Sequence, residues 1–179
     1  MFSINDSLLL VIDVQGQLAY LMHEKEKLFK HMQALIQAAG HLNIPIIYTE
    51  QVPEKIGTTV PEITQYLSHL KPIKKKTFSC CGEDQFLKAL KSFRRKQIIV
   101  CGIETHVCVY QTVSDLVNKK YQVQVVADAV SSRTYENKTL ALERIKSLGV
   151  PITATEMIIC ELLKTSNHEK FKEILKLIK

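Results

Sequence analysis

Residues 7–13 read Ser7-Leu8-Leu9-Leu10-Val11-Ile12-Asp13, an unbroken apolar run that ends on a carboxylate. A run of this length and composition predicts a β-strand that is buried on both faces. Three similar runs, each rich in β-branched residues and each with a polar or glycine stop, occur at 44–49, 97–103 and 122–128. Such strands are typical of the interior of a parallel sheet.

Helical patterns separate these strands. Apolar residues between the first two strands recur at the spacing of one helix face, namely Leu28, Met32, Leu35, Ile36, Ala39 and Leu42. The same reasoning predicts further helices at 83–94, 105–119, 136–148 and 168–179, a short strand before Lys76, and a brief strand followed by a helix within 152–163. The alternation predicts an α/β fold of three layers, with a six-stranded parallel sheet between two layers of helices.

Length and composition fit one domain over 1–179, because 46% of the 179 residues are hydrophobic and only 23% are charged. No apolar run approaches the roughly 20 residues of a membrane-spanning helix, and the first residues lack the basic start of a signal peptide. We therefore expect a cytoplasmic protein without a membrane partner.

The formal net charge is +6, which raises the question of nucleic-acid binding. The basic clusters at 74–76, 94–96 and 119–120 are short, far apart and free of interleaved aromatic residues. This pattern does not favour a nucleic-acid partner. The five cysteines are odd in number and irregularly spaced, so we expect a reducing compartment, no disulfide framework and no metal site. Phosphate-binding glycine motifs are absent, which disfavours a nucleotide cofactor.

Ligands of an open parallel sheet bind beyond the carboxyl ends of its strands, so the polar residues there are candidates for a site. Cys108 lies where the strand 97–103 leads into a helix, and amide dipoles at a helix start favour a thiolate. Asp13 ends the first strand, which we expect to neighbour the strand that precedes Cys108, and burial would suit its carboxyl group to proton transfer. Lys76 precedes a small and apolar stretch that suggests a pocket.

Each of these residues also has a structural interpretation. Cys108 could be a small buried hydrophobe, Asp13 a turn or cap residue, and Lys76 part of a solvated basic run. His106 is two residues from Cys108 and points to another side of the helix, so it is not expected to act as its base. The irregular segment 50–72 is a candidate for an active-site flap.

Three segments carry a resemblance to a known family, namely Leu9 to Gln15, Lys76-Thr77-Phe78-Ser79, and Gly102 to Thr112. Together they resemble the isochorismatase-like cysteine hydrolases. A further set of segments is similar to the isochorismatase domain-containing branch of that family, namely 50–53 with 57–58, 128–133 and 171–174. The resemblance implies an isochorismatase-like, Rossmann-like fold and a catalytic triad of Asp13, Lys76 and Cys108. It also implies a cis peptide bond between Ile103 and Glu104 and an oxyanion hole of the Glu104 and Cys108 backbone N–H groups. Further candidates for contact with a small-molecule substrate are Gln15, Gln51, Phe78 and Tyr110.

The resemblance implies a hydrolase that cleaves a small amide or related carbonyl compound through a thioester, without a cofactor, as a homodimer or larger homo-oligomer. The nicotinamidase branch carries an Asp-x-His metal cluster after the second strand, but residues 49–62 contain no histidine. Nicotinamidase activity is therefore not expected. The alternatives are a non-catalytic binding or scaffold protein, hydrolysis of a vinyl ether of the isochorismate type, and a redox-sensing thiol.

Overall fold

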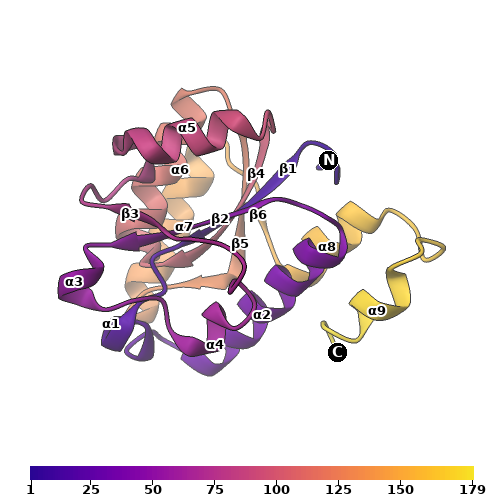
Figure 1. Cartoon of the computed structure of the whole chain (residues 1–179), viewed down its shortest axis with the longest axis horizontal. Helices are drawn as coiled ribbons and strands as arrows, with labels where there is room; N and C mark the ends of the chain where they lie inside the picture. Colours follow the sequence, from indigo (N-terminus) through magenta and orange to yellow (C-terminus); the bar gives the residue numbers. More distant parts are fainter.

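The computed structural model describes all residues, 1–179, and has a six-stranded parallel sheet at its centre (Figure 1). The strand order is β3-β2-β1-β4-β5-β6. The strands are β1 (Ser7–Ile12), β2 (Ile46–Gln51), β3 (Ile73–Lys75), β4 (Gln97–Ile103), β5 (Gln122–Ser131) and β6 (Ile152–Thr153). The predicted fold class is therefore confirmed.

Helices cover both faces of this sheet (Figure 1). One face packs against α2 (Lys25–His41) and α8 (Thr155–Leu163), and the other against α5 (Asp84–Ser92), α6 (Tyr110–Asn118) and α7 (Tyr135–Ser147). Leu9 and Val11 of β1 enter the first core, whereas the alternate side chains enter the second. All six residues of β1 are buried, as expected for a strand covered on both faces.

The strand order reverses beside β1, because β2 lies on one side of it and β4 on the other. In the register of the sheet, Ile12 at the end of β1 pairs with Thr49 of β2 and with Gly102 of β4. The residues that follow these three strands therefore meet at one point. This is the switch point at which open α/β sheets bind their ligands.

Short helices lie beyond the carboxyl ends of these strands. They are α1 (Gly16–Tyr20), α3 (Pro53–Ile56) and α4 (Pro61–Thr64). Gly16 has a φ of +46°, and a Cβ atom there would lie 2.0 Å from the carbonyl oxygen of Ile56. The start of α1 thus packs directly on the backbone at the end of α3, which is possible only for glycine.

The expected flap, 50–72, is partly helical and is tied to the sheet. The carboxylate of Glu50 is buried and accepts hydrogen bonds from the backbone N–H and the hydroxyl of Thr59, at 2.8 and 2.9 Å. Thr59 also forms an isolated β-bridge with Gln15. These contacts hold both ends of α3 beside the switch point.

Two predicted helices differ in the structure. The helix expected at 105–119 begins with a π-helical turn, Thr105–Val109, before α6. The helix expected at 168–179 is limited to α9 (Phe171–Leu175), in which only Ile174 is buried. A single buried side chain gives little packing energy to extend that helix. No helix of the chain has the length and apolar composition needed to cross a bilayer.

Candidate active site

Asp13 directly follows β1, and its side chain is almost entirely buried. Oδ1 accepts a hydrogen bond of 2.7 Å from the hydroxyl of Thr49, at the neighbouring position of β2. Oδ2 lies 2.6 Å from the ammonium nitrogen of Lys75. The carboxylate is therefore held between a neutral donor and a buried cation.

Lys75, and not the predicted Lys76, is the lysine of this cluster. Side chains of a strand alternate between faces, and β3 places Ile73 and Lys75 inward with Lys74 between them exposed. The side chain of Lys75 is 1% exposed. Lys76 follows the end of the strand, is exposed, and donates its backbone N–H to Glu83 at 2.7 Å. The expectation was one residue too late, because a strand of three residues gives too little pattern to fix its inward positions.

The ammonium group of Lys75 lies among several acceptors besides Asp13. It donates to Oε1 of Gln51 at 2.5 Å and to the carbonyl oxygens of Thr77 and Phe78 at 3.0 and 2.9 Å. Burial is the largest single effect on this group and opposes its charge, but the attraction of Asp13, added to the effects of Cys108 and Cys80 and to the hydrogen bond with Asp13, raises the pKa of Lys75 overall. Lys75 is thus a fixed cation at neutral pH.

Cys108 lies in the π-helical turn after β4, with its residue 8% exposed. Its sulfur is 3.6 Å from the ammonium nitrogen of Lys75. Burial, together with the charge of Asp13, raises the pKa of the Cys108 thiol to about 12, even though Lys75 lowers it. The expectation of a resting thiolate is therefore wrong, because the charge of Lys75 is already balanced by Asp13.

A second thiol lies beside this cluster. Cys80 is fully buried, and its sulfur is 3.8 Å from the hydroxyl oxygen of Thr49. Burial raises the pKa of Cys80 to about 12, so this thiol also stays protonated. The adjacent Cys81 is buried as well.

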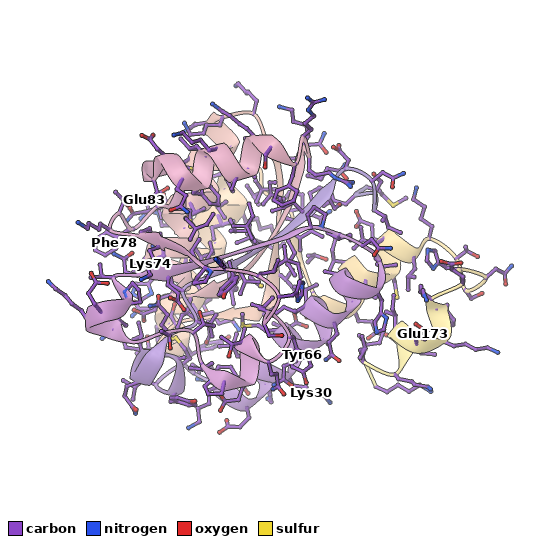
Figure 2. The ribbon with its side chains drawn as sticks, in the orientation of Figure 1. Lys30, Tyr66, Lys74, Phe78, Glu83 and Glu173 are labelled. Atoms are coloured by element: carbon purple, nitrogen blue, oxygen red, sulfur yellow. The ribbon has the colours of Figure 1, made fainter.

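A cavity of about 110 Å³ opens onto the cluster. Figure 2 labels Phe78, which lies at the end of the molecule where Figure 1 shows α3. Phe78 is 56% exposed and forms part of the cavity wall. The complete lining is Asp13, Gln15, Leu18, Gln51, Ile56, Phe78, Ile103, Glu104, Val107 and Cys108. Larger hollows elsewhere contain neither Asp13 nor Cys108.

Gln15 and Gln51 line the cavity as expected, but both side chains are already engaged within the protein. The amide oxygen of Gln15 accepts from the backbone N–H of Gln51 at 2.6 Å, and its nitrogen donates to the carbonyl oxygens of Gln51 and Gly57. The amide nitrogen of Gln51 donates to the carbonyl oxygen of Lys76. These contacts indicate that the two glutamines hold the segment around α3 against the site.

Tyr110 does not belong to the cavity lining. Its hydroxyl accepts a hydrogen bond of 2.7 Å from Arg144, whose guanidinium group also lies 4.4 Å from the centre of the ring. Tyr110 starts α6, and its contacts with Arg144 direct its side chain toward α7. The expected substrate contact at Tyr110 is therefore not supported by its position.

The peptide bond between Ile103 and Glu104 is cis. Glu104 lines the cavity, and its carboxylate accepts hydrogen bonds from the backbone N–H and Nε of Arg133, at 3.2 and 3.0 Å. His106 pairs with the hydroxyl of Ser132 at 2.9 Å and forms no hydrogen bond with Cys108, in agreement with its helical position. No group of three or more His, Cys, Asp or Glu side chains in the chain is arranged to hold a metal ion.

Sequence reasoning missed Lys75 and most of the apolar cavity wall. Leu18 and Ile56 come from α1 and α3, two helices of five and four residues, and Val107 comes from the π-helical turn. The alternation of Ile73, Lys74 and Lys75 is the one signal that could have identified the correct lysine. Helices this short have too few residues to show a periodic pattern.

Comparisons with known proteins agree with this fold. A family model described as the isochorismatase domain matches residues 7–157. Isochorismatase domain-containing protein 2 of Danio rerio is 38% identical, over 98% of this chain and 88% of its own.

Two solved structures superpose over nearly the whole chain. The MAR1 ribonuclease of Caenorhabditis elegans is 38% identical with a TM-score of 0.92, over 99% of this chain and 91% of that one. The YcaC gene product of Escherichia coli is described as an octameric hydrolase of unknown specificity. It is 25% identical with a TM-score of 0.93, over 99% of this chain and 88% of that one. The chain thus has an isochorismatase-like hydrolase fold and belongs to the isochorismatase family, whose members similar to it include isochorismatase domain-containing proteins.

Proposed function

We propose that this protein hydrolyses a small amide or related carbonyl compound through a covalent thioester on Cys108. The observation that carries the proposal is the meeting of Asp13, Lys75 and Cys108 at one small cavity beyond the carboxyl ends of the strands. Lys75 replaces the expected Lys76 in the triad. A nucleophile with an adjacent base and a group that orients the base is the arrangement that covalent catalysis requires.

The first half-reaction begins with a neutral thiol, because the pKa of Cys108 is about 12. Asp13 takes the thiol proton as the sulfur attacks the substrate carbonyl carbon, and the backbone N–H groups of Glu104 and Cys108 stabilise the oxyanion. Asp13 then gives the proton to the amide nitrogen, the C–N bond breaks, and ammonia or an amine leaves. The acyl group stays on sulfur as a thioester.

The second half-reaction reverses these roles with water. Asp13 accepts a proton from water as its oxygen attacks the thioester carbonyl, the C–S bond breaks, and the proton returns to sulfur. Lys75 keeps its proton throughout and holds the carboxylate beside the sulfur. The sum is one water consumed and one carboxylic acid plus ammonia or amine released, with no oxidant or metal required.

The alternatives lack a favouring observation at the site. Hydrolysis of a vinyl ether does not need Cys108, whereas that thiol lines the cavity together with Asp13. A structural neighbour is named a ribonuclease, but the cavity lining contains no Lys, Arg or His to hold a phosphate. A scaffold protein without turnover is distinguished by the assay below. For assembly, we propose a homodimer or larger oligomer, supported by the octamer described for the Escherichia coli neighbour.

The test is ammonia release from a panel of small amides. Cys108→Ala is expected to abolish turnover, and Asp13→Asn to reduce it by about 10²–10⁴-fold, since general acid–base catalysis contributes that much. Cys160→Ala is the matched control, because Cys160 is an exposed cysteine on α8, and it should retain wild-type rates. Equal turnover by the wild type and Cys108→Ala would reject the mechanism, and no turnover by any of the proteins would favour the scaffold.

A further inference from the structure

The cavity beside Cys108 has an unusual charge composition for a ligand site. Its lining contains two ionisable carboxylates, Asp13 and Glu104, and no lysine, arginine or histidine. Recognition of a carboxylate or phosphate group normally uses a cationic side chain that reaches the ligand. An anionic substrate would instead find acidic residues and no cationic side chain in the lining.

Both carboxylates are already paired with cations that lie outside the lining. Asp13 has Lys75 at 2.6 Å, and the ammonium group of Lys75, whose side chain is 1% exposed, is already occupied by acceptors within the protein and is not part of the lining. Glu104 has the guanidinium nitrogen Nε of Arg133 at 3.0 Å. A cationic substrate would compete with these internal partners for the same oxygens. The pairing therefore leaves no uncompensated charge of either sign for a substrate.

The rest of the lining is mostly apolar. Leu18, Ile56, Phe78, Ile103 and Val107 form the wall, and the amide groups of the two lining glutamines are occupied by contacts within the protein. Burying a charged group against such a wall without a partner carries a large desolvation penalty. The wall therefore favours a hydrocarbon group.

The volume limits the size of that group. At about 110 Å³ the cavity is well below the roughly 300–1,000 Å³ of pockets for drug-sized ligands. It is also smaller than an apolar cavity of about 150 Å³, which holds one benzene molecule. An acyl chain of about two to five carbon atoms fits this space, and a substituted aromatic ring does not.

Resting on the proposed function, we infer that the substrate is a small uncharged aliphatic amide, whose acyl chain of about two to five carbons occupies this cavity. The acyl group is the part that must fit, because it stays on Cys108 after the amine has left. Amides that carry a carboxylate are excluded by the same lining. This excludes dicarboxylate substrates of the isochorismate type as well.

The first experiment compares matched substrates on the wild-type protein. The uncharged 3-methylbutanamide and the anionic malonamate have the same number of non-hydrogen atoms and differ in an isopropyl or a carboxylate group. We expect kcat/KM to be at least about a hundredfold higher for 3-methylbutanamide, and to fall sharply from pentanamide to octanamide. Preferred hydrolysis of malonamate or octanamide would overturn the inference and leave the proposed function intact, whereas hydrolysis of no amide would overturn both.

The second experiment tests the charge preference of the cavity by alkylation of Cys108, which requires no turnover. Iodoacetamide and iodoacetate are neutral and anionic alkylating reagents of similar size, and mass spectrometry gives their rates at Cys108 and at the exposed Cys160 of the same chain. We expect the ratio of the iodoacetamide rate to the iodoacetate rate to be at least about tenfold higher at Cys108. Equal ratios at the two cysteines would overturn the inference.

A matched pair of variants tests the wall itself. Ile56 is the last residue of α3 and lines the cavity, whereas Leu148 directly follows α7 and lies on a different surface. Both residues are 37% exposed. Ile56→Ala should move the chain-length limit to longer amides, and Ile56→Lys should raise the malonamate-to-3-methylbutanamide ratio of kcat/KM at least about tenfold. Leu148→Ala and Leu148→Lys should change neither. Unchanged selectivity in both Ile56 variants would contradict the assigned wall.

Discussion

Lys75 and Lys76 are adjacent in the chain and chemically identical, yet the structure gives them opposite environments. The ammonium group of Lys75 is buried against Asp13 and four further acceptors, whereas the side chain of Lys76 is exposed. A buried ion pair adds little net stability, but removing one partner leaves the other charge buried without compensation. The two lysines therefore form a natural test pair.

Replacing these lysines one at a time should have very different effects on stability and turnover. Lys75→Met is expected to lower the free energy of unfolding by about 3–5 kcal/mol and to abolish amide turnover, because Asp13 is left as an unpaired buried carboxylate. Lys76→Met should change the free energy of unfolding by less than about 0.5 kcal/mol, as is usual for a surface substitution. Urea unfolding and ammonia release measure both effects. Equal losses in the two variants would refute the assignment of Lys75.

Asp13 also affects the ionisation of Cys108, because its negative charge adds to burial in raising the pKa of the thiol. In Asp13→Asn this repulsion disappears and Lys75 is free to stabilise the thiolate, so the pKa should fall from about 12. We expect Cys108 in Asp13→Asn to react with iodoacetamide at pH 8 at least about tenfold faster than in the wild type, while amide turnover falls. Both proteins should carry Cys160→Ser, which removes the exposed thiol. Slower alkylation in Asp13→Asn would show that Asp13 does not hold the thiol protonated.

Between elements, the packing of β4 on β1 constrains the backbone beside the site. Gly102 pairs with Ile12 and has a φ of +123°, and a Cβ atom there would lie 2.2 Å from the carbonyl oxygen of Ile12. The obstructing atom belongs to the backbone of a central strand, which cannot move aside without breaking the sheet. Glycine is therefore required at this position.

A pair of glycine substitutions checks this requirement. Gly102→Ala should lower the free energy of unfolding by about 3 kcal/mol or more. It should also reduce turnover, because the added methyl group would push apart the two strands that carry Asp13 and lead to Cys108. Gly40→Ala, in helix α2, should instead raise the free energy of unfolding by about 0.4–1 kcal/mol, because nothing lies within 4 Å of the added methyl group. Urea unfolding of both variants is the measurement. A tolerated Gly102→Ala would mean that β1 and β4 do not pack this closely.

Over the whole molecule, four buried cysteines make stability depend on pH. Burial raises the pKa of Cys80 and Cys108 to about 12, that of Cys81 to about 11, and that of Cys101 as well. Unfolded thiols titrate near 8.5, so above that pH the unfolded chain releases protons that the folded chain keeps. The stability is fully present below pH 8.5 and is lost as the pH rises from there toward 12.

The expected loss is up to about 1.4 kcal/mol per pH unit for each buried thiol. Urea unfolding in a reducing buffer from pH 7.5 to 10 would show the slope. Cys101→Ala should reduce that slope by one thiol's share, whereas Cys160→Ala should leave it unchanged because Cys160 is exposed. A free energy of unfolding that stays constant between pH 8.5 and 10 would contradict the burial of these thiols.

Part of this architecture was predictable from local pattern. The buried runs and the helix periodicity gave the six-stranded parallel sheet, and the rule for switch points placed Asp13 near Cys108, which the register of β1 with β4 explains. The segments that resemble the isochorismatase family identified the family correctly. These features repeat over many residues, so a single misassigned position does not change them.

Other features depend on contacts between distant parts of the chain. The choice of Lys75 over Lys76 depends on which side chains of a three-residue strand face the core, and the apolar wall depends on how α1 and α3 pack at Gly16 and Ile56. Periodicity in the chain therefore determined the fold and the position of the site. The ionisation of Cys108, the lysine beside it and the shape of the cavity were decided by three-dimensional packing, because desolvation and charge pairing depend on which groups surround an atom.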